Sequence, residues 1–471
     1  MVSVRSPRTR RTIPFLIATC HCERSAATCH CERSVAIKAR VFVAMAALLL
    51  TVLALPAQAK YSGGTGEPND PYQIATAADL ILLGESPGDY DKHFLLTADI
   101  DLDPNLPGRK VFDKAVIAPD TNPADTYSQF QGKSFTGVFD GKGHAISGLT
   151  IIGKDYVDLF GGLASRADVQ NLRVVDVHIT GSGSYIGGLA GWNYYGRVTH
   201  CYSSGTVSGA GDRVGGLVGW NYGDVIQCYS IGAVTGKNYV GGLVGESYGI
   251  VLHSVWDMET SGLSGSAGGV GLTTAEMMDP YILGLNGFAN DPNWVLDAGR
   301  DYSRLARARE GAGGRIIREP DIDWLEGEGT PDSPYRIDTA DQLILLSKAS
   351  ILWDKHFVLG SDINLDPTLP GRHVFAQAVI PVFMGVFDGN AHTISHLTIT
   401  GAGHLGLFAR LEAEAEVKNL GVVDVNITGS GSCVGGLVGS SGSCPRRQRG
   451  QLLHHRGGRW HRVGCRRAGG V

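Results

Sequence analysis

The stretch Gly187-Gly188-Leu189-Ala190-Gly191 decides the fold, because closely similar stretches return at residues 215–219, 241–245 and 435–439. We call these four stretches the glycine phrases. The first three begin 28 and 26 residues apart. This period is too short for a domain and is typical of one solenoid coil, which buries its apolar face by stacking on the next coil. The repeated structural positions are Gly187, Gly188, Leu189, Gly191, Gly215, Gly216, Leu217, Gly219, Gly241, Gly242, Leu243, Gly245, Gly435, Gly436, Leu437 and Gly439.

Short segments rich in β-branched residues follow the phrases, such as residues 225–230 and 233–235, and each is bounded by glycine. We expect the paired glycines to adopt positive φ and turn a corner, while the leucine points inward. Coils about 4.8 Å apart would stack like residues into ladders. Two such ladders are Leu189, Leu217 and Leu243, and Cys201, Cys228 and Ser254. The sequence therefore predicts an all-β fold, a right-handed parallel β-solenoid (β-helix).

The three consecutive phrases resemble the repeats of the bacterial GLUG-motif proteins, which are named for a Gly-Leu-any-Gly core. The resemblance extends more loosely over residues 61–440. It implies a β-solenoid of pectin-lyase-like appearance in large secreted or surface proteins, whose activity is mostly unassigned. Some members belong to IgA-cleaving metallopeptidases, which need an H-E-x-x-H zinc helix. No histidine here is followed by glutamate, so that activity is not carried over.

The body of the chain is duplicated. Pro-Tyr-Gln-Ile at residues 71–74 returns as Pro-Tyr-Arg-Ile at 334–337, and residues 99–104 return as 362–367. The first copy has extra residues before its Val-Phe-Asp-Gly at 138–141, and the polar stretch 118–134 is the expected surface insertion. Each copy opens with a helix-start pattern before a leucine-rich run, at Thr76 with Asp79 and at Thr339 with Gln342. We expect these helices to cap the open ends of two tandem solenoid units.

These features predict the domain boundaries. Residues 60–305 form the first unit, with its repeats at 187–260; residues 306–323 form a linker; and residues 324–440 form a second, truncated unit. We interpret residues 1–37 as spurious upstream translation, because a short Cys/His-containing segment is duplicated there without the spacing of a zinc finger. Residues 38–59 have the pattern of a secretory signal peptide, with cleavage after Ala59. Residues 441–471 carry eight arginines and no acidic residue, and we interpret them as a frameshifted tail.

The composition restricts the possible partners. Glycine makes up 66 of 471 residues, about twice its average share, and 43% of residues are hydrophobic, which indicates a turn-rich β protein. The formal net charge is −5, and the basic residues gather at the two ends, so the body is strongly acidic. An acidic body disfavours nucleic acid and anionic membranes as partners. The sequence predicts neither a cofactor nor a transmembrane segment in the mature chain.

Two clusters could have bound metal or formed a disulfide. Asp99, Asp101 and Asp103 alternate on one strand face, but proline follows them and the calcium-loop glycine and glutamate are missing. We therefore expect a solvated face and no metal site. Cys201 and Cys228 occupy equivalent places in adjacent coils, where a bridge is geometrically possible, and we favour a buried ladder of small residues.

Aromatic residues recur just after the phrases and should form a ladder along one edge of the solenoid. They are Trp192, Tyr194, Tyr195, Trp220, Tyr222 and Tyr248. Such a ladder can stack on sugar rings, or it can simply stabilise the solenoid by about 0.5–1.5 kcal/mol per pair. No nucleophile elbow or phosphate loop is present. We expect an exported, non-enzymatic surface or extracellular protein, structural or adhesive, that binds a glycan or protein partner. The alternative is a carbohydrate-active β-helix enzyme, a polysaccharide lyase or glycoside hydrolase.

Overall fold

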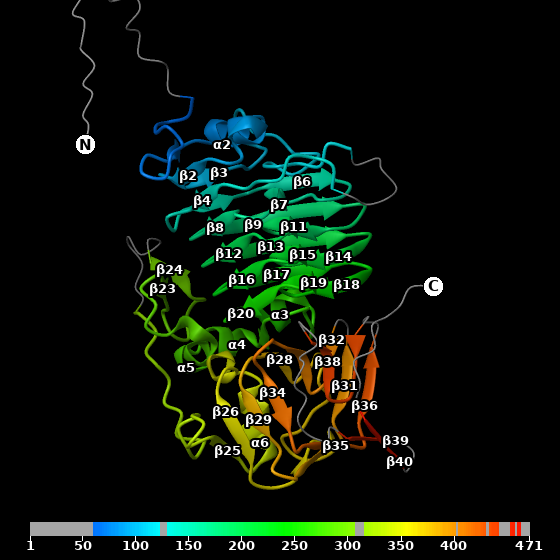
Figure 1. Cartoon of the computed structure of the whole chain (residues 1–471). Helices are drawn as coiled ribbons and strands as arrows, with labels where there is room; N and C mark the ends of the chain where they lie inside the picture. Colours follow the sequence, from blue (N-terminus) through cyan, green and yellow to red (C-terminus); the bar gives the residue numbers. More distant parts are fainter. Residues whose placement is uncertain are drawn as a thin grey trace, which may run out of the picture. The chain divides into compact units, whose positions relative to one another are not determined.

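The computed structural model of the chain describes residues 60–122, 130–306, 315–401, 404–429, 433–441, 453–456 and 459–462. These residues form a parallel β-solenoid of about ten turns, as the repeat predicts. Strands of successive coils lie side by side in Figure 1, from β8 (Asp168–Gln170) through β12 (Arg197–Thr199) and β16 (Asp224–Ile226) to β20 (Ile250–Leu252). The expected signal peptide and upstream segment lie outside the described residues.

Each regular coil of the first unit contains four strands, one in each of four parallel sheets. The first sheet adds β1 (Tyr72–Ile74), β2 (His93–Leu96) and β4 (Val138–Asp140) to the four strands above. The second contains β3 (Ile100–Asp101), β5 (Ala145–Ser147), β6 (Thr150–Gly153), β9 (Arg173–Gly181), β13 (Tyr202–Gly209), β17 (Tyr229–Thr235), β21 (Val255–Asp257) and β22 (Val270–Leu272). The third contains β10 (Ile186–Gly187), β14 (Asp212–Gly215) and β18 (Asn238–Gly241). The fourth contains β7 (Phe160–Leu163), β11 (Ala190–Asn193), β15 (Val218–Asn221) and β19 (Val244–Ser247).

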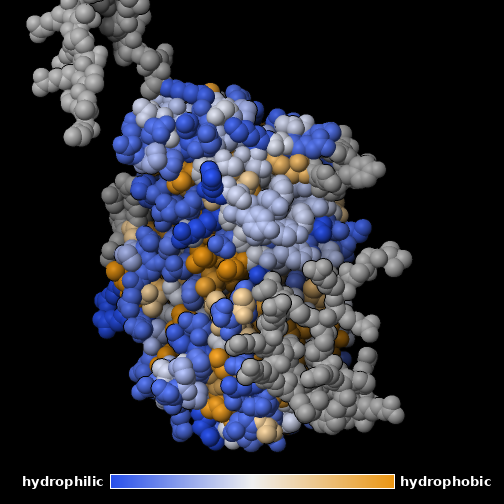
Figure 2. Space-filling model, viewed as in Figure 1, coloured by the Kyte–Doolittle hydropathy of each residue, from blue (hydrophilic) through white to orange (hydrophobic). Residues whose placement is uncertain are grey.

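The interior of the first unit is a stack of apolar ladders. Leu189, Leu217 and Leu243 are fully buried, which confirms the predicted inward leucines. Blue and pale side chains cover most of the face seen in Figure 2, and orange ones form only small patches. This distribution follows from the period-two alternation of a strand, because each inward apolar residue is flanked by outward polar ones.

Each glycine phrase turns the corner between the third and fourth strands, as predicted, but the expected reason was wrong. None of the phrase glycines has positive φ. A Cβ on Gly188 would lie 2.5 Å from the carbonyl oxygen of Gly216, and a Cβ on Gly216 would lie 2.2 Å from that of Gly242. Glycine is therefore required because the backbones of adjacent coils approach too closely for a side chain.

Positive-φ residues occur at several other places, and four of them lie at the corner between the first and second strands. They form a ladder of Asn171, His200, Gln227 and His253, with φ of 53°, 51°, 52° and 50°. Residues 225–230 were expected to be one strand, but this corner divides them between β16 and β17. Non-glycine residues are uncommon in this region of φ, and their recurrence shows that every coil repeats the same turn.

The predicted capping helices are confirmed. Helix α2 (Ala77–Gly84) begins with a capping box between Thr76 and Asp79. Its duplicate α6 (Ala340–Leu346) begins with one between Thr339 and Gln342. The short helix α4 (Thr274–Met277) has a third, between Thr273 and Glu276, after the last coil of the first unit. In each box two backbone amides that a helix start leaves unpaired find partners.

The end of the first unit is covered by short elements. They are α3 (Met258–Ser261), α5 (Pro280–Leu283), a helical turn at Gly284–Phe288, and the antiparallel pair β23 (Trp294–Val295) and β24 (Arg304–Leu305). Within the expected linker, Ile317 is buried and bridges to Ala289, and Arg315 bridges to Leu296. The boundaries at 305 and 323 stay predictions.

The second unit repeats the first with fewer coils. Its strands are β25 (Tyr335–Ile337), β26 (His356–Leu359), β27 (Ile363–Asn364), β28 (Ile380–Phe383), β29 (Val386–Asp388), β30 (Thr393–Ser395), β31 (Thr398–Gly401), β32 (His404–Leu405), β33 (Phe408–Leu411), β34 (Glu416–Lys418), β35 (Gly421–Val423), β36 (Asn426–Gly429), β37 (Cys433–Val434) and β38 (Val438–Ser441). Two further strands, β39 (Leu453–Arg456) and β40 (Arg459–Arg462), pair antiparallel. Most of the remaining tail lies outside the described residues, and the frameshift stays a prediction. Among the described residues, no helix is long and apolar enough to cross a membrane.

Candidate functional site: an aromatic surface on three coils

The structure brings the six predicted aromatic residues into one connected surface. We call Trp192, Tyr194, Tyr195, Trp220, Tyr222 and Tyr248 the aromatic surface. Trp192 and Trp220 stack with ring centroids 6.3 Å apart, and each contacts the tyrosine two residues later, at 5.0 and 4.8 Å. Tyr222 and Tyr248 stack at 5.0 Å with 19° between their planes. The rings therefore run without a gap across three successive coils.

The register of the fourth sheet sets this arrangement. Trp192 of β11 pairs with Trp220 of β15, and Trp220 pairs with Glu246 of β19. Ala190 and Asn193 on β11 are buried, whereas Trp192 is only half-buried. Because neighbouring strands are about 4.8 Å apart, two tryptophans in register must stack on each other.

The exposure of the rings differs along the surface. Tyr195 is 58% exposed, Tyr194 41% and Tyr248 39%, and Tyr222 is half-buried. Burial, helped by the nearby Glu246 carboxylate, raises the pKa of Tyr222. Stacked rings shield each other's faces, so the surface presents ring edges and hydroxyl groups, together with the more open rings of Tyr194 and Tyr195.

A cation lies beside the aromatic rings, and sequence reasoning missed it. The Arg213 guanidinium lies 4.9 Å from the ring centroid of Trp220, 5.2 Å from Tyr185 and 5.3 Å from Tyr239. It also donates to the carboxylate of Glu246, which is 4% exposed. Burial opposes the charge of Arg213, but Glu246, together with Tyr185 and Tyr248, more than compensates and raises the pKa of Arg213. The cation–π contact of Arg213 holds the Trp220 ring in place.

Polar ladders run through the buried interior beneath the aromatic surface. Asn193 Nδ2 donates to Asn221 Oδ1 at 2.8 Å, and Asn221 Nδ2 donates to the hydroxyl of Ser247 at 3.1 Å. All three residues are buried. The dipeptide Trp-Asn at residues 192–193 and 220–221 was a sequence signal that could have revealed this ladder. A buried ladder of hydrogen-bonded amides fixes the register of the coils.

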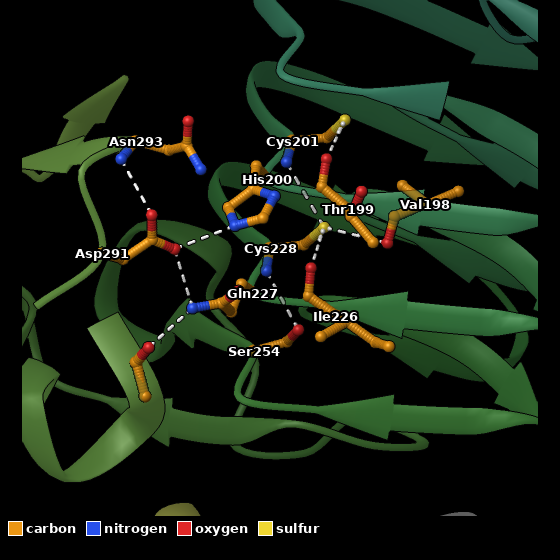
Figure 3. Close-up of polar contacts among 11 residues, drawn as sticks. Val198, Thr199, His200, Cys201, Ile226, Gln227, Cys228, Ser254, Asp291 and Asn293 are labelled. Carbon is orange, nitrogen blue, oxygen red and sulfur yellow. Dashed lines mark hydrogen bonds and ion pairs between the residues drawn. The ribbon is translucent and has the colours of Figure 1, made fainter. Parts of the chain in front are cut away.

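The predicted ladder of Cys201, Cys228 and Ser254 is present. The amide of Cys201 donates to Cys228 Sγ at 3.4 Å, and the amide of Cys228 donates to Ser254 Oγ at 3.0 Å (Figure 3). Both thiols are free and fully buried. Burial raises the pKa of the Cys201 thiol, so it is a structural group and not a nucleophile.

The side of the solenoid is covered by the segment that follows α5. Asp291 accepts from His200 Nε2 and from Gln227 Nε2, both at 2.9 Å, as Figure 3 shows. Trp294 from the same segment is fully buried, 5.5 Å from Tyr229. The outward corner residues of two coils thus anchor a cover that closes this flank.

One buried acid has no counterpart in the other coils. Asp158 is fully buried; its Oδ1 accepts from the amide of Gly187, and its Oδ2 has no hydrogen-bond partner. Burial raises the pKa of this carboxyl well above its usual value, and the amide only partly offsets the shift. Asp158 therefore stays protonated over much of the pH range in which other aspartates are charged.

Two of the three alternating aspartates, Asp101 and Asp103, line a groove with Asp176 and His178. Asp101 Oδ1 accepts from the amide of Asp103, and Asp103 Oδ1 accepts from the amide of Asn105. Asp99 accepts from Ala145 and lies 3.0 Å from His144 Nδ1 instead of facing the groove. Within the described ranges, no group of three His, Cys, Asp or Glu side chains is arranged to hold a metal ion.

Comparison with known proteins identifies the repeat. The family model for the GLUG motif matches residues 182–208. Halomucin from Haloquadratum walsbyi is 35% identical over 123 residues, which are 24% of this chain and 1% of halomucin. A candidate Gly-rich membrane protein from Evansella cellulosilytica is 32% identical over 142 residues, 28% of this chain and 14% of that protein. The chain thus spans only a small part of either relative.

Among solved structures, a candidate immunoglobulin A1 protease from Bacteroides ovatus is 17% identical, with a TM-score of 0.34 over 52% of this chain and 95% of that chain. The residues that match the family model contain the first glycine phrase, from strand β10 to strand β13. The part of the solenoid that contains the first glycine phrase therefore carries the GLUG motif.

Proposed function

We propose that this chain is an exported structural or adhesive repeat protein of a bacterial cell surface or extracellular space. In this proposal the aromatic surface binds a glycan or a protein partner and does not transform it. The observation that carries the proposal is the row of partly exposed tyrosine and tryptophan rings across three coils. Aromatic rings with hydroxyl groups at their edges offer an apolar contact and a hydrogen bond at once, and they are enriched in binding surfaces.

The second unit supports a binding role over a purely structural one. Its duplicated coils keep the buried aromatic positions, so that Phe160 of β7 corresponds to Phe408 of β33. The outward position of Trp192 is occupied by Ser440, which pairs with Arg410 in the same register. Because the second unit forms its coils without the tryptophan row, stacking alone does not explain why the first unit has it.

The similarity to halomucin and to a candidate Gly-rich membrane protein supports a surface location. A glycan partner suits the surface because a sugar ring also has an apolar face and hydroxyl edges. A protein partner would use the same tyrosines as anchors. The acidic groove gives the enzyme alternative less support, because the carboxylates of Asp101 and Asp103 each already accept from the backbone amide two residues further along the chain.

The test is a glycan array and a cell-surface protein overlay with the purified chain, run beside a Tyr195→Ala, Trp220→Ala double variant. We expect binding by the natural chain and at least a tenfold loss in the variant. Tyr281→Ala, at a half-buried tyrosine outside the aromatic surface, is the matched control. Release of reducing ends or of unsaturated sugars from any bound glycan would contradict the non-enzymatic role. Equal binding by the double variant would refute the site.

A further inference from the structure

We propose that Tyr222 and Tyr248 form an oxidative cross-linking site, where a peroxide acting through a peroxidase joins the two phenol rings by a carbon–carbon bond. The rings belong to neighbouring coils and stack with centroids 5.0 Å apart and 19° between their planes. A bond between them would join two coils covalently on the outside of the solenoid. This chemistry does not depend on which partner the aromatic surface binds.

Access for an oxidant distinguishes this pair from the other stacked tyrosines. Tyr202 and Tyr229 stack at 4.5 Å, and Tyr156 and Tyr185 stack at 4.6 Å, but none of these four is more than 7% exposed. Tyr248 is 39% exposed. An oxidant in solution therefore reaches the proposed pair and is kept from the more tightly stacked buried pairs.

A proton acceptor is already in place. The hydroxyl of Tyr248 donates to Glu246 Oε1 at 2.9 Å. A phenol that loses an electron must also lose its proton, and a carboxylate within hydrogen-bonding distance can take it. Glu246 is itself fixed by its ion pair with Arg213. Tyr248 is therefore the tyrosine of the surface best prepared for oxidation.

Neighbouring rings can pass the oxidation to this pair. Tyr194 and Tyr195 lie 6.0 and 6.4 Å from Tyr222, and Trp220 lies 4.8 Å from it. A radical formed first on the most exposed ring, Tyr195, is in contact with Tyr222. A one-electron oxidation at any ring of the aromatic surface can thus be transferred to Tyr222 and Tyr248.

The reaction balances without a further reagent. Each phenol loses one electron and one proton, and the two radicals couple at the carbons ortho to the hydroxyl groups. The ortho hydrogens then move to the oxygens as the rings regain aromaticity. The pair has lost two hydrogen atoms in all, and hydrogen peroxide accepts them and is reduced to two molecules of water.

The experiment treats the full chain with a haem peroxidase and hydrogen peroxide, follows dityrosine fluorescence and identifies cross-linked peptides by mass spectrometry. We expect one dominant intramolecular product that joins the peptides of Tyr222 and Tyr248 and is lighter by two hydrogen atoms. Tyr248→Phe, which keeps the stacked ring, should abolish this product, as should Tyr222→Phe. Tyr281→Phe should leave its yield unchanged.

Glu246→Gln tests the proton acceptor separately, with circular dichroism to verify that each variant is folded. It should slow formation of the cross-link several-fold, because an amide cannot take the phenol proton. Absence of the Tyr222–Tyr248 product in the natural chain would overturn the proposal. Products formed only between molecules, or a yield that Tyr248→Phe leaves unchanged, would do so as well.

Discussion

Gly216→Ala is the substitution that best tests how the coils are held together. An added Cβ would lie 2.2 Å from the carbonyl oxygen of Gly242 and 3.0 Å from the Cβ of Ser230. Forcing an extra carbon into a packed interior costs about 1–3 kcal/mol. Moving the coil apart instead weakens the bonds from Gly216 N to Gly241 O (3.2 Å) and from Gly188 N to Gly216 O (3.1 Å), each worth about 1 kcal/mol.

Alanine also lowers the conformational entropy of the unfolded chain, which stabilises the folded state by about 0.4–1 kcal/mol. Either way, the net expectation is a loss of about 1–2 kcal/mol in the free energy of unfolding. Urea unfolding followed by the far-ultraviolet circular dichroism of the strands measures it as a lower midpoint. Gly88→Ala is the matched control, because a Cβ there meets nothing within 4 Å and its φ is not positive. If both variants unfold at the same midpoint, close approach of the coils is not why the phrase needs glycine.

Three further substitutions test the polar groups. Asp158→Asn should raise the melting temperature at pH 7. Because burial raises the pKa of Asp158 in the folded state, the natural chain loses stability as pH rises above the ordinary aspartate range, by up to about 1.4 kcal/mol per pH unit. Melting curves from pH 4 to 8 should show that this slope vanishes in the variant. Asn221→Leu should cost about 3 kcal/mol in urea unfolding, since it leaves Asn193 and Ser247 without their ladder partner, and a change under 1 kcal/mol would contradict that role. Asp99→Asn should weaken the loss of stability in acid, because burial opposes the charge of Asp99 but hydrogen bonds, first that from the Ala145 amide, lower its pKa in the folded state. The stability that Asp99 contributes is therefore present above its unfolded-state pKa and is lost as pH falls through its folded-state pKa. Melting curves of the variant from pH 2 to 5 that match those of the natural chain would refute this.

The sequence was informative wherever a residue repeats at the coil period. Leu189, Leu217 and Leu243 could be placed in the core because equivalent positions of a solenoid share one environment. The capping helices were predictable because a capping box is a local pattern. The clustering of Trp192 and Trp220 followed from their common distance to the glycine phrase. The role of that cluster in binding is a proposal that the fold alone does not test.

Features that depend on non-repeated contacts could not be predicted. Arg213 stands two residues before its glycine phrase, as Tyr185 and Tyr239 do before theirs, so these two contacts follow the coil period; its contacts with Trp220 and Glu246 join different positions of the coil and appear only in the fold. Asp158 was missed because nothing in its local sequence shows that the next coil will bury it. The positive-φ prediction for the phrase was wrong because a short glycine-rich stretch has two explanations, a turn and a close approach. The second requires knowledge of the neighbouring coil.

The two solenoid units can be compared with each other, because contacts that both units have can be set against features that only one unit has. Asp99 Oδ1 lies 3.0 Å from His144 Nδ1, and Oδ1 of its duplicate Asp362 lies 3.3 Å from His392 Nδ1, so an Asp–His contact that the sequence did not predict recurs in both units. A contact that both copies keep is explained by the coil that they share, because in each copy the aspartate also accepts from the equivalent backbone amide, that of Ala145 or of Thr393. The described part of the second unit does not repeat the aromatic surface, since Ser440 occupies the position that corresponds to Trp192. Features that only one copy has must be explained by something outside the coil, which is why binding and oxidation experiments belong on the first unit.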